Sequence, residues 1–259
     1  MQLRPRKHPE KAARLKAAAI IEQKKYTTSM IGQCLPCGDR MVLVEFEAAI
    51  SEEINDAVHG LAAAIEAAEI AGIIEWVPSY RSLGVYYDPL RIQYAELVQR
   101  LNELERKEAP GRLRSSTRVE IPVVYGGRMG PDLESVARLH RITPEEVIAL
   151  HTGGRYRVFL IGFTPGFPYL GGLHGTLATP RLPTPRSRVP EGSVAIGGQQ
   201  TGIYPVESPG GWRLIGRTPL RLFDVGRRSP CVLKPGDQVV FRSISEAEFQ
   251  ELAAARSIR

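Results

Sequence analysis

The chain has 259 residues, of which 43% are hydrophobic and 24% are charged. This length and composition exclude a disordered chain and indicate a globular protein with one large or two smaller cores. No run of about 18 apolar residues occurs, and the N-terminus lacks the apolar stretch and the cleavage site of a secretory signal. We therefore expect a cytoplasmic protein without a membrane partner.

The net charge of +6 is distributed unevenly along the chain. Residues 1–35 contain eight Lys and Arg against two Asp and Glu, and residues 162–236 contain nine against three. We interpret residues 1–34 as a basic, poorly ordered extension rather than a segment that binds nucleic acid or membrane. The second basic stretch is rich in Gly and Pro and suggests an anionic ligand.

The three cysteines do not form the pattern of a secreted disulfide framework, because their number is odd. Cys34 and Cys37 have CxxC spacing, but no second pair exists that would complete a zinc site. We interpret them as incidental thiols, with zinc or redox chemistry as the alternative.

The first half of the chain alternates strand and helix patterns. Ser51 is a candidate N-cap for a helix with one apolar stripe, formed by Ile54, Val58, Leu61 and Ile65. A second helix is expected over residues 92–107, and strands are expected over 41–46, 72–77, 82–87 and 118–125. The order β-α-β-β-α-β predicts a ferredoxin-like domain over residues 35–126.

A pair of short helices is expected over residues 127–154, where it would connect two domains. Asp132 is a candidate cap for the first helix, and Thr143 followed by Pro144 and Glu146 is a strong start signal for the second. The pair has the outline of a helix-turn-helix, but the second helix begins with two glutamates and contains no Lys or Arg. Acids at that position repel phosphates, so no nucleic-acid partner is predicted.

The last hundred residues have a different composition, with 14 Gly and 11 Pro in residues 162–236. Short apolar runs between turn signals predict a β-barrel over residues 155–245. A surface helix is expected over residues 246–259. The sequence therefore predicts an α+β protein with two architectures in one chain.

The stretch GFTPGFPYLGG, residues 162–172, is the most unusual local feature. Two prolines and four glycines would hold the rings of Phe163, Phe167 and Tyr169 rigidly at low entropic cost. Such a wall suits a ligand, but the same rings could instead complete a core. Both interpretations remain open at this point.

Polar candidates follow this stretch. Arg181, Arg186 and Arg188 lie in a proline-stiffened segment and suit carboxylate or phosphate, unless they are solvated surface groups. Residues 199–204 add hydrogen-bonding groups beside glycines. His151 ends a predicted helix, whose negative end is expected to raise the pKa of the imidazole; a histidine that only caps the helix is the alternative. No phosphate-binding GxxxxGK[ST] loop occurs.

Several segments together resemble one known family. They are IPVVYGG, HTGGRYRVFLIGFTPGFPYLGGL, LATPRLPTPRSRVPEGSVAIGGQQTGIYPVESPGGWRLIGRTPLRLF and LKPGDQVVF. From about Leu35 to Phe241 the chain is similar to the family of the 5-oxoprolinase B subunit (PxpB). The family includes the sporulation kinase inhibitor KipI and part of the urea carboxylase carboxyltransferase domain, often labelled allophanate hydrolase subunit 1.

The resemblance implies a ferredoxin-like domain followed by a cyclophilin-like β-barrel. It also implies a component of a hydrolase that acts on a cyclic amide, and this component would be inactive alone. With the partner proteins PxpA and PxpC, such a chain opens 5-oxoproline to glutamate at the expense of ATP. ATP would be a co-substrate shared with PxpC, a divalent metal could accompany it, and the chain itself would hold no metal.

Roles for individual residues follow from the residue chemistry and the resemblance together. The expected catalytic residues, which would move protons or bind the reacting group, are His151, Gln200 and Tyr204. The expected substrate-binding residues are Phe163, Phe167, Tyr169, Arg181, Arg186, Arg188, Thr201 and Arg217.

Two alternatives come from the same resemblance. A KipI-like regulator would bind a histidine kinase and use the aromatic, proline-rich surface as a docking face. A carboxyltransferase component of urea or allophanate metabolism would instead require a partner that carries biotin.

Overall fold

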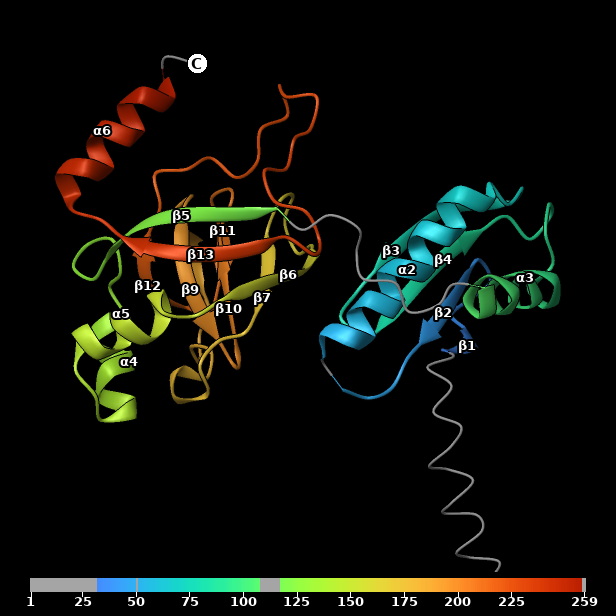
Figure 1. Ribbon diagram of the computed structural model, residues 1–259, viewed down its shortest axis with the longest axis horizontal. Helices are drawn as coiled ribbons and strands as arrows, with labels where there is room; N and C mark the ends of the chain where they lie inside the picture. Colours follow the sequence, from blue (N-terminus) through green and yellow to red (C-terminus); the bar gives the residue numbers. More distant parts are fainter. Residues whose placement is uncertain (1–31, 50, 108–116, 258–259) are drawn as a thin grey trace, which may run out of the picture.

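The computed structural model describes residues 32–49, 51–107 and 117–257, which form an α/β unit and a β-barrel unit (Figure 1). The predicted basic extension lies outside the described residues, except for its last three positions. Two of these positions, Gln33 and Cys34, begin strand β1, so ordered structure starts slightly earlier than expected.

The α/β unit contains one antiparallel sheet among its described residues, with the strand order β1-β2-β4-β3. Its strands are β1 (Gln33–Pro36), β2 (Met41–Glu45), β3 (Ile73–Pro78) and β4 (Ser82–Tyr87). Its helices are α2 (Glu52–Ala68) and α3 (Tyr94–Lys107). Strand β1 was not expected from the sequence, whereas the bounds of the other five elements agree closely with the expected ones.

Helix α2 begins where the sequence predicts. The side chain of Ser51 accepts a hydrogen bond from the backbone N–H of Ile54 at 3.2 Å, which satisfies a donor in the first turn. The predicted apolar stripe is buried in the core of the α/β unit, together with Val42, Val44, Leu83, Val85, Leu97 and Leu101. Burial of this stripe stabilises the helix more than its intrinsic propensity does.

The predicted ferredoxin-like sheet is wrong in one strand. β5 (Arg118–Tyr125) does not join the α/β unit but lies in the barrel, parallel to β13 (Gln238–Ser243). Strand β1 occupies an edge of the first sheet instead. Residues 121–124 of β5 are all buried, so both faces of this strand are covered. Such a strand shows no alternation of apolar and polar residues, and its pattern therefore does not indicate which sheet it joins. Residues 35–126 are therefore not one structural unit.

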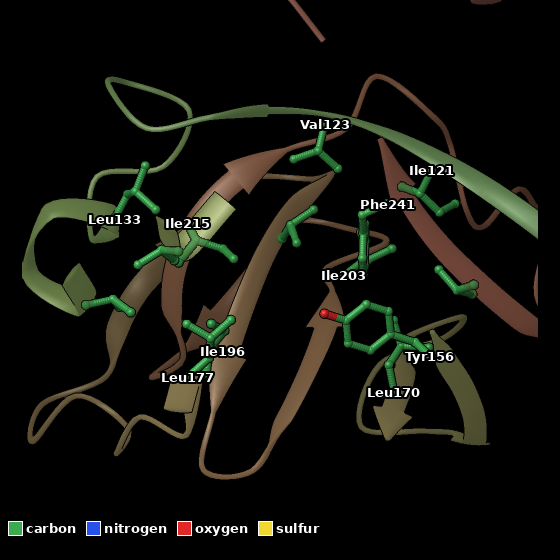
Figure 2. Close-up of a cluster of buried hydrophobic side chains, with 14 of the residues drawn as sticks. Ile121, Val123, Leu133, Tyr156, Leu170, Leu177, Ile196, Ile203, Ile215 and Phe241 are labelled. Atoms are coloured by element: carbon green, nitrogen blue, oxygen red, sulfur yellow. The ribbon is translucent and has the colours of Figure 1, made fainter. Parts of the chain in front are cut away.

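Within residues 117–257, seven strands close a barrel in the order β10-β7-β6-β13-β5-β12-β9. The strands not yet given are β6 (Tyr156–Ile161), β7 (Pro168–Gly171), β9 (Ser193–Gly197), β10 (Gln200–Ile203) and β12 (Arg213–Arg217). Large apolar side chains fill the interior, among them Leu170, Ile196, Ile203, Ile215 and Phe241 (Figure 2). The barrel expected from the sequence is confirmed.

A two-stranded sheet and a short helix accompany the barrel. The sheet pairs β8 (Arg186–Val189) with β11 (Ser208–Gly210), and the 3-10 helix η1 covers Gly175–Leu177. Arg186 and Arg188 therefore lie on a strand that is not part of the closed barrel.

Helices α4 (Leu133–His140) and α5 (Pro144–Thr152) pack on the barrel, with Leu133 and Val147 in its core cluster. The pair was expected to connect the two domains, but it follows β5 and precedes β6, so it is an insertion between two barrel strands. Thr143 forms the expected capping box. Asp132 makes no side-chain cap, because its carboxylate is engaged elsewhere.

The last described element is helix α6 (Glu246–Ser257), at the position predicted from the sequence. Phe249 of α6 packs against Val124 of β5 and so covers the outer face of that strand. No helix among the described residues is long and apolar enough to cross a membrane.

Candidate functional site

A cavity of about 380 Å³ lies at one end of the barrel. It is lined by strand ends and by the loops that join them, through Phe159, Gly171, Gly172, Leu173, Gly175, Ala178, Gln199 and Gln200. None of these residues is charged. Their polar groups are two glutamine amides and glycine backbone, which can both donate and accept hydrogen bonds. The cavity therefore suits a small, uncharged polar ligand or the uncharged part of a larger one.

Phe159 reaches this cavity because strand β6 contains a β-bulge. The register between β6 and β7 shifts between Val158 and Leu160, which leaves Phe159 as the extra residue. Its ring packs against Gly171, where an added Cβ would lie 1.7 Å from Cε2 of Phe159. Glycine at position 171 is therefore required for the position of this ring.

Tyr80 of the α/β unit contributes to the same site. Its hydroxyl accepts a hydrogen bond from Nε2 of Gln200, a cavity residue. Its ring centroid lies 5.8 Å from those of Phe159 and Tyr169. Burial raises the pKa of Tyr80 above its usual range, so the phenol remains neutral. Two residues that line the cavity, Phe159 and Gln200, are thus in contact with the α/β unit.

Tyr80 was not among the site residues predicted from the sequence. The turn at residues 78–80 between two strands was expected, and the only local signal was an aromatic residue at that turn. The contact with Gln200 joins positions 120 residues apart, which no local pattern indicates.

The aromatic stretch lies mainly in a second core cluster on the barrel's outer side. Phe167 and Tyr204 are 2% and 1% exposed and pack with Trp212, Ala195 and Leu214. Ala195 and Leu214 alternate with barrel-core residues along β9 and β12, so they face away from the barrel interior. For Phe167, completion of a core is therefore the correct interpretation.

Phe163 differs from its neighbours, because it is 62% exposed and has a φ of 66°. This left-handed conformation is uncommon for a bulky residue. Its ring packs edge to face on Phe167, with centroids 5.6 Å apart. Phe163 is thus an exposed ring held on a buried aromatic base.

His151 lies inside the barrel, with no exposed surface. Its Nδ1 is 2.7 Å from the Tyr125 hydroxyl, and its Nε2 is 3.0 Å from Oγ1 of Thr201, which is also fully buried. Burial lowers the pKa of His151 to about 3. The expected upward shift is wrong, because the loss of hydration outweighs the field of the helix end.

The predicted arginines do not line the cavity. Arg186 forms an ion pair of 2.8 Å with Asp132, and Arg188 forms one of 2.6 Å with Glu207. Arg217 donates from Nε to the carbonyl oxygen of Glu191. Arg181 lies over the ring of Trp212, with Cζ 5.8 Å from the centroid. Carboxylates of this chain therefore neutralise part of the predicted cationic patch.

Asp132 links two of these elements. One carboxylate oxygen pairs with Arg186, and the other accepts a hydrogen bond of 2.7 Å from the backbone N–H of Leu214. This use of both oxygens explains why the side chain does not cap α4. Of the predicted catalytic and substrate-binding residues, Gln200 lines the cavity, beside Gln199 of the same predicted polar segment.

The cysteines and acidic residues form no built metal centre in the part of the chain that the structure describes. Cys34, Cys37 and Cys231 are free thiols. Burial raises the pKa of Cys34, which disfavours the reactive thiolate.

Comparison with known proteins places this architecture in a family. Residues 32–233 match the family described as carboxyltransferase domain, subdomain C and D. The 5-oxoprolinase B subunit of Bacillus subtilis (strain 168) is 44% identical over 223 residues, which cover 82% of this chain and 92% of the relative. This chain belongs to the 5-oxoprolinase PxpB family.

A second member of the family, the 5-oxoprolinase B subunit of Haemophilus influenzae, is 49% identical over 173 residues. These residues cover 65% of this chain and 78% of the relative. The crystal structure of TTHA0988 is 40% identical, with a TM-score of 0.71, and the match covers 80% of this chain. This chain spans 40% of that longer chain. Urea amidolyases and a putative urea carboxylase are more distant, at 21 to 27% identity.

Proposed function

We propose that this member of the PxpB family acts in an ATP-dependent 5-oxoprolinase, which opens 5-oxoproline to glutamate. The cavity lined by two glutamine amides and glycine backbone carries the proposal. A cyclic amide offers one N–H and one carbonyl oxygen, and primary amides complement both. A neutral lining suits the uncharged lactam ring, because a charged wall group without a partner would cost free energy when the ring covers it.

The residues around the cavity would then orient the ring. Gln200 would bind the amide, and the hydrogen bond to Tyr80 would hold its side chain in place. Phe159 would form the apolar wall and exclude water. His151 and Thr201 would support strand β10 from inside the barrel, because the hydrogen bond between them is fully enclosed. The catalytic roles predicted for His151 and Tyr204 have no support from their positions in the core.

The lining of the cavity offers no cation to a phosphate group. Arg186 and Arg188 are paired with carboxylates. We infer that ATP, and any divalent metal that accompanies it, bind with the help of a partner chain. Among the predicted arginines, Arg181 is a candidate to meet an anion near the cavity, because its charge acts on Tyr80 and Tyr169.

A multi-subunit complex is part of the proposal. The relatives are named as subunits, and this chain matches 40% of a longer solved chain, which indicates further domains beside it. We propose PxpA and PxpC as the partners. Phe163 is a suitable contact, because an exposed, rigid aromatic ring makes a good anchor in an interface.

We also propose a finer description of the fold. The α/β unit would be a ferredoxin-like variant in which β1 takes the edge position expected for residues 118–125. Its antiparallel strand order β1-β2-β4-β3 and its two helices support this description. The closed barrel would be of the cyclophilin-like type.

Co-purification with PxpA and PxpC tests the function. Wild-type complex should hydrolyse ATP in response to 5-oxoproline, and Gln200→Leu should lower kcat/KM about tenfold or more, because a hydrogen-bonding partner of the substrate is lost. Gln238→Leu is the matched control, because Gln238 is exposed on β13. ATP hydrolysis that ignores 5-oxoproline, or normal activity of Gln200→Leu, would contradict the proposal.

Carboxyl transfer in urea or allophanate metabolism is a second candidate, favoured by the description of the matching family. It requires a biotin-carrying partner, which streptavidin blotting of the co-purified proteins would detect. A histidine kinase recovered with this chain in the absence of PxpC would instead favour the regulatory alternative, with Phe163 as the docking residue.

A further inference from the structure

The backbone of Phe159 connects the cavity to the α/β unit. At the β-bulge, its carbonyl oxygen accepts hydrogen bonds from Nδ2 of Asn55 at 3.2 Å and from Nε2 of His59 at 2.9 Å. Both donors lie on helix α2 and are 0% and 7% exposed. A carbonyl acceptor requires the proton on Nε2 of His59. Two buried side chains of one unit thus fix the residue whose ring lines the cavity of the other.

Asn55 also holds a second element, the turn whose Tyr80 contacts a residue of the cavity lining. Its Nδ2 lies 3.2 Å from the carbonyl oxygen of Ser79 and 3.4 Å from that of Tyr80. Tyr80 in turn accepts the hydrogen bond from Gln200. One amide group therefore joins the backbone of Phe159 and the turn that carries Tyr80.

A separate contact between the same elements does not involve the cavity wall. Arg157 of β6 forms ion pairs with Glu52 and Asp56 of α2. Glu52 is 65% exposed and lies 3.4 Å from Arg157, so this pair is weak and can be broken without affecting the carbonyl of Phe159. It supplies a matched control.

We propose that Asn55 and His59 are positioning residues, which set the geometry of the cavity wall from outside the barrel. Removal of either donor would leave the Phe159 carbonyl short of a partner and allow the bulge to relax. The ring would then move from Gly171, and the contact between Tyr80 and Gln200 would loosen in the case of Asn55. For the identity of the ligand, 5-oxoproline, the inference rests on the proposed function.

The steady-state test uses the complex with PxpA and PxpC. Asn55→Asp and His59→Leu each remove an N–H donor, and each should raise KM for 5-oxoproline about tenfold with a smaller change in kcat. His59→Gln should restore KM to within about twofold of wild type, because the glutamine Nε2 replaces the imidazole donor. Glu52→Gln should leave KM unchanged. Rescue by glutamine separates positioning from a general loss of stability.

The second readout is backbone hydrogen exchange of the full chain without partners. Faster exchange over residues 157–173 in His59→Leu, with wild-type rates in His59→Gln and Glu52→Gln, supports the inference even if the complex shows no 5-oxoproline turnover. The exchange experiment therefore distinguishes failure of this inference from failure of the proposed function. Wild-type exchange over residues 157–173 in folded His59→Leu would overturn it, and so would a melting temperature that falls equally in His59→Leu and His59→Gln with no change over this segment.

Discussion

Two buried histidines of this chain, His151 and His59, differ in their location and in their hydrogen-bond partners. His151 is enclosed in the barrel, where its partners Tyr125 and Thr201 belong to the same unit. His59 lies between the units, and its partner, the carbonyl of Phe159, belongs to a residue that lines a cavity. Burial lowers the pKa of both. A lowered pKa alone therefore does not locate a functional site. The position of His59 next to a cavity-lining residue is what distinguishes it from His151.

The largest effect is expected at His151 under acid conditions. Its pKa of about 3 in the folded chain lies below the ordinary value of about 6.5, so the unfolded chain binds the proton more readily. Stability that is present above about pH 6.5 should fall by about 1.4 kcal/mol per pH unit towards pH 3, or about 3 kcal/mol at pH 4. Urea denaturation of wild type and His151→Gln at pH 7 and pH 4 would isolate this contribution. Equal acid destabilisation of the two proteins would contradict the enclosed position of His151.

The next effect concerns the packing of the cavity wall. Gly171→Ala should destabilise the chain by about 2 kcal/mol, because the new methyl group would overlap the ring of Phe159. Gly175→Ala is a matched control, because Gly175 also lines the cavity and a Cβ there meets nothing within 4 Å. Thermal unfolding of both variants checks the difference. Equal stability would mean that the ring can leave the cavity wall at little cost.

A smaller effect is expected from one hydroxyl group at the junction. Tyr80→Phe keeps the ring contacts with Phe159 and Tyr169 but removes the acceptor for Gln200. KM for 5-oxoproline should rise about fivefold, as for loss of a single hydrogen bond of about 1 kcal/mol. Tyr86→Phe, at a position 41% exposed on β4, serves as the control. An unchanged KM in Tyr80→Phe would show that the Tyr80 hydroxyl does not contribute to substrate binding, and that barrel residues alone form the site.

The smallest effect is expected on the outer surface. Arg188 is exposed and pairs with Glu207, so Arg188→Gln should change the free energy of unfolding by less than about 0.5 kcal/mol. It should also leave 5-oxoproline-dependent ATP hydrolysis near wild type. A marked loss of that activity would show that Arg188 takes part in the reaction despite its ion pair with Glu207. The distinction between a neutral site and an uninvolved basic surface would then not hold.

Local signals in the sequence predicted much of the fold. Ser51 and Thr143 begin helices as expected, because a cap needs only its own first turn. The change to short, glycine-punctuated strands predicted the barrel. The predicted sheet assignment of β5 is wrong, because a strand pattern indicates which faces are buried but not which strand lies beside it.

The candidate site was less predictable than the fold. The sequence singled out residues by chemistry, and Gln200 lies in the cavity, but Tyr204, Thr201 and His151 are buried in cores. The same side chains suit a ligand or a neighbouring side chain, and sequence chemistry does not distinguish the two. The charge count likewise could not show that Arg186 is paired with Asp132, since ion pairs between distant residues require the folded chain.

By itself, the sequence determined the membership of the family, the helix starts and the presence of a barrel, because motifs, caps and composition are local properties. Only the tertiary structure decided that helix α2 holds the wall of the barrel's cavity. Asn55 and Phe159 are 104 positions apart, and Tyr80 and Gln200 are 120 apart. Such contacts follow from how the two units pack, which no short segment encodes.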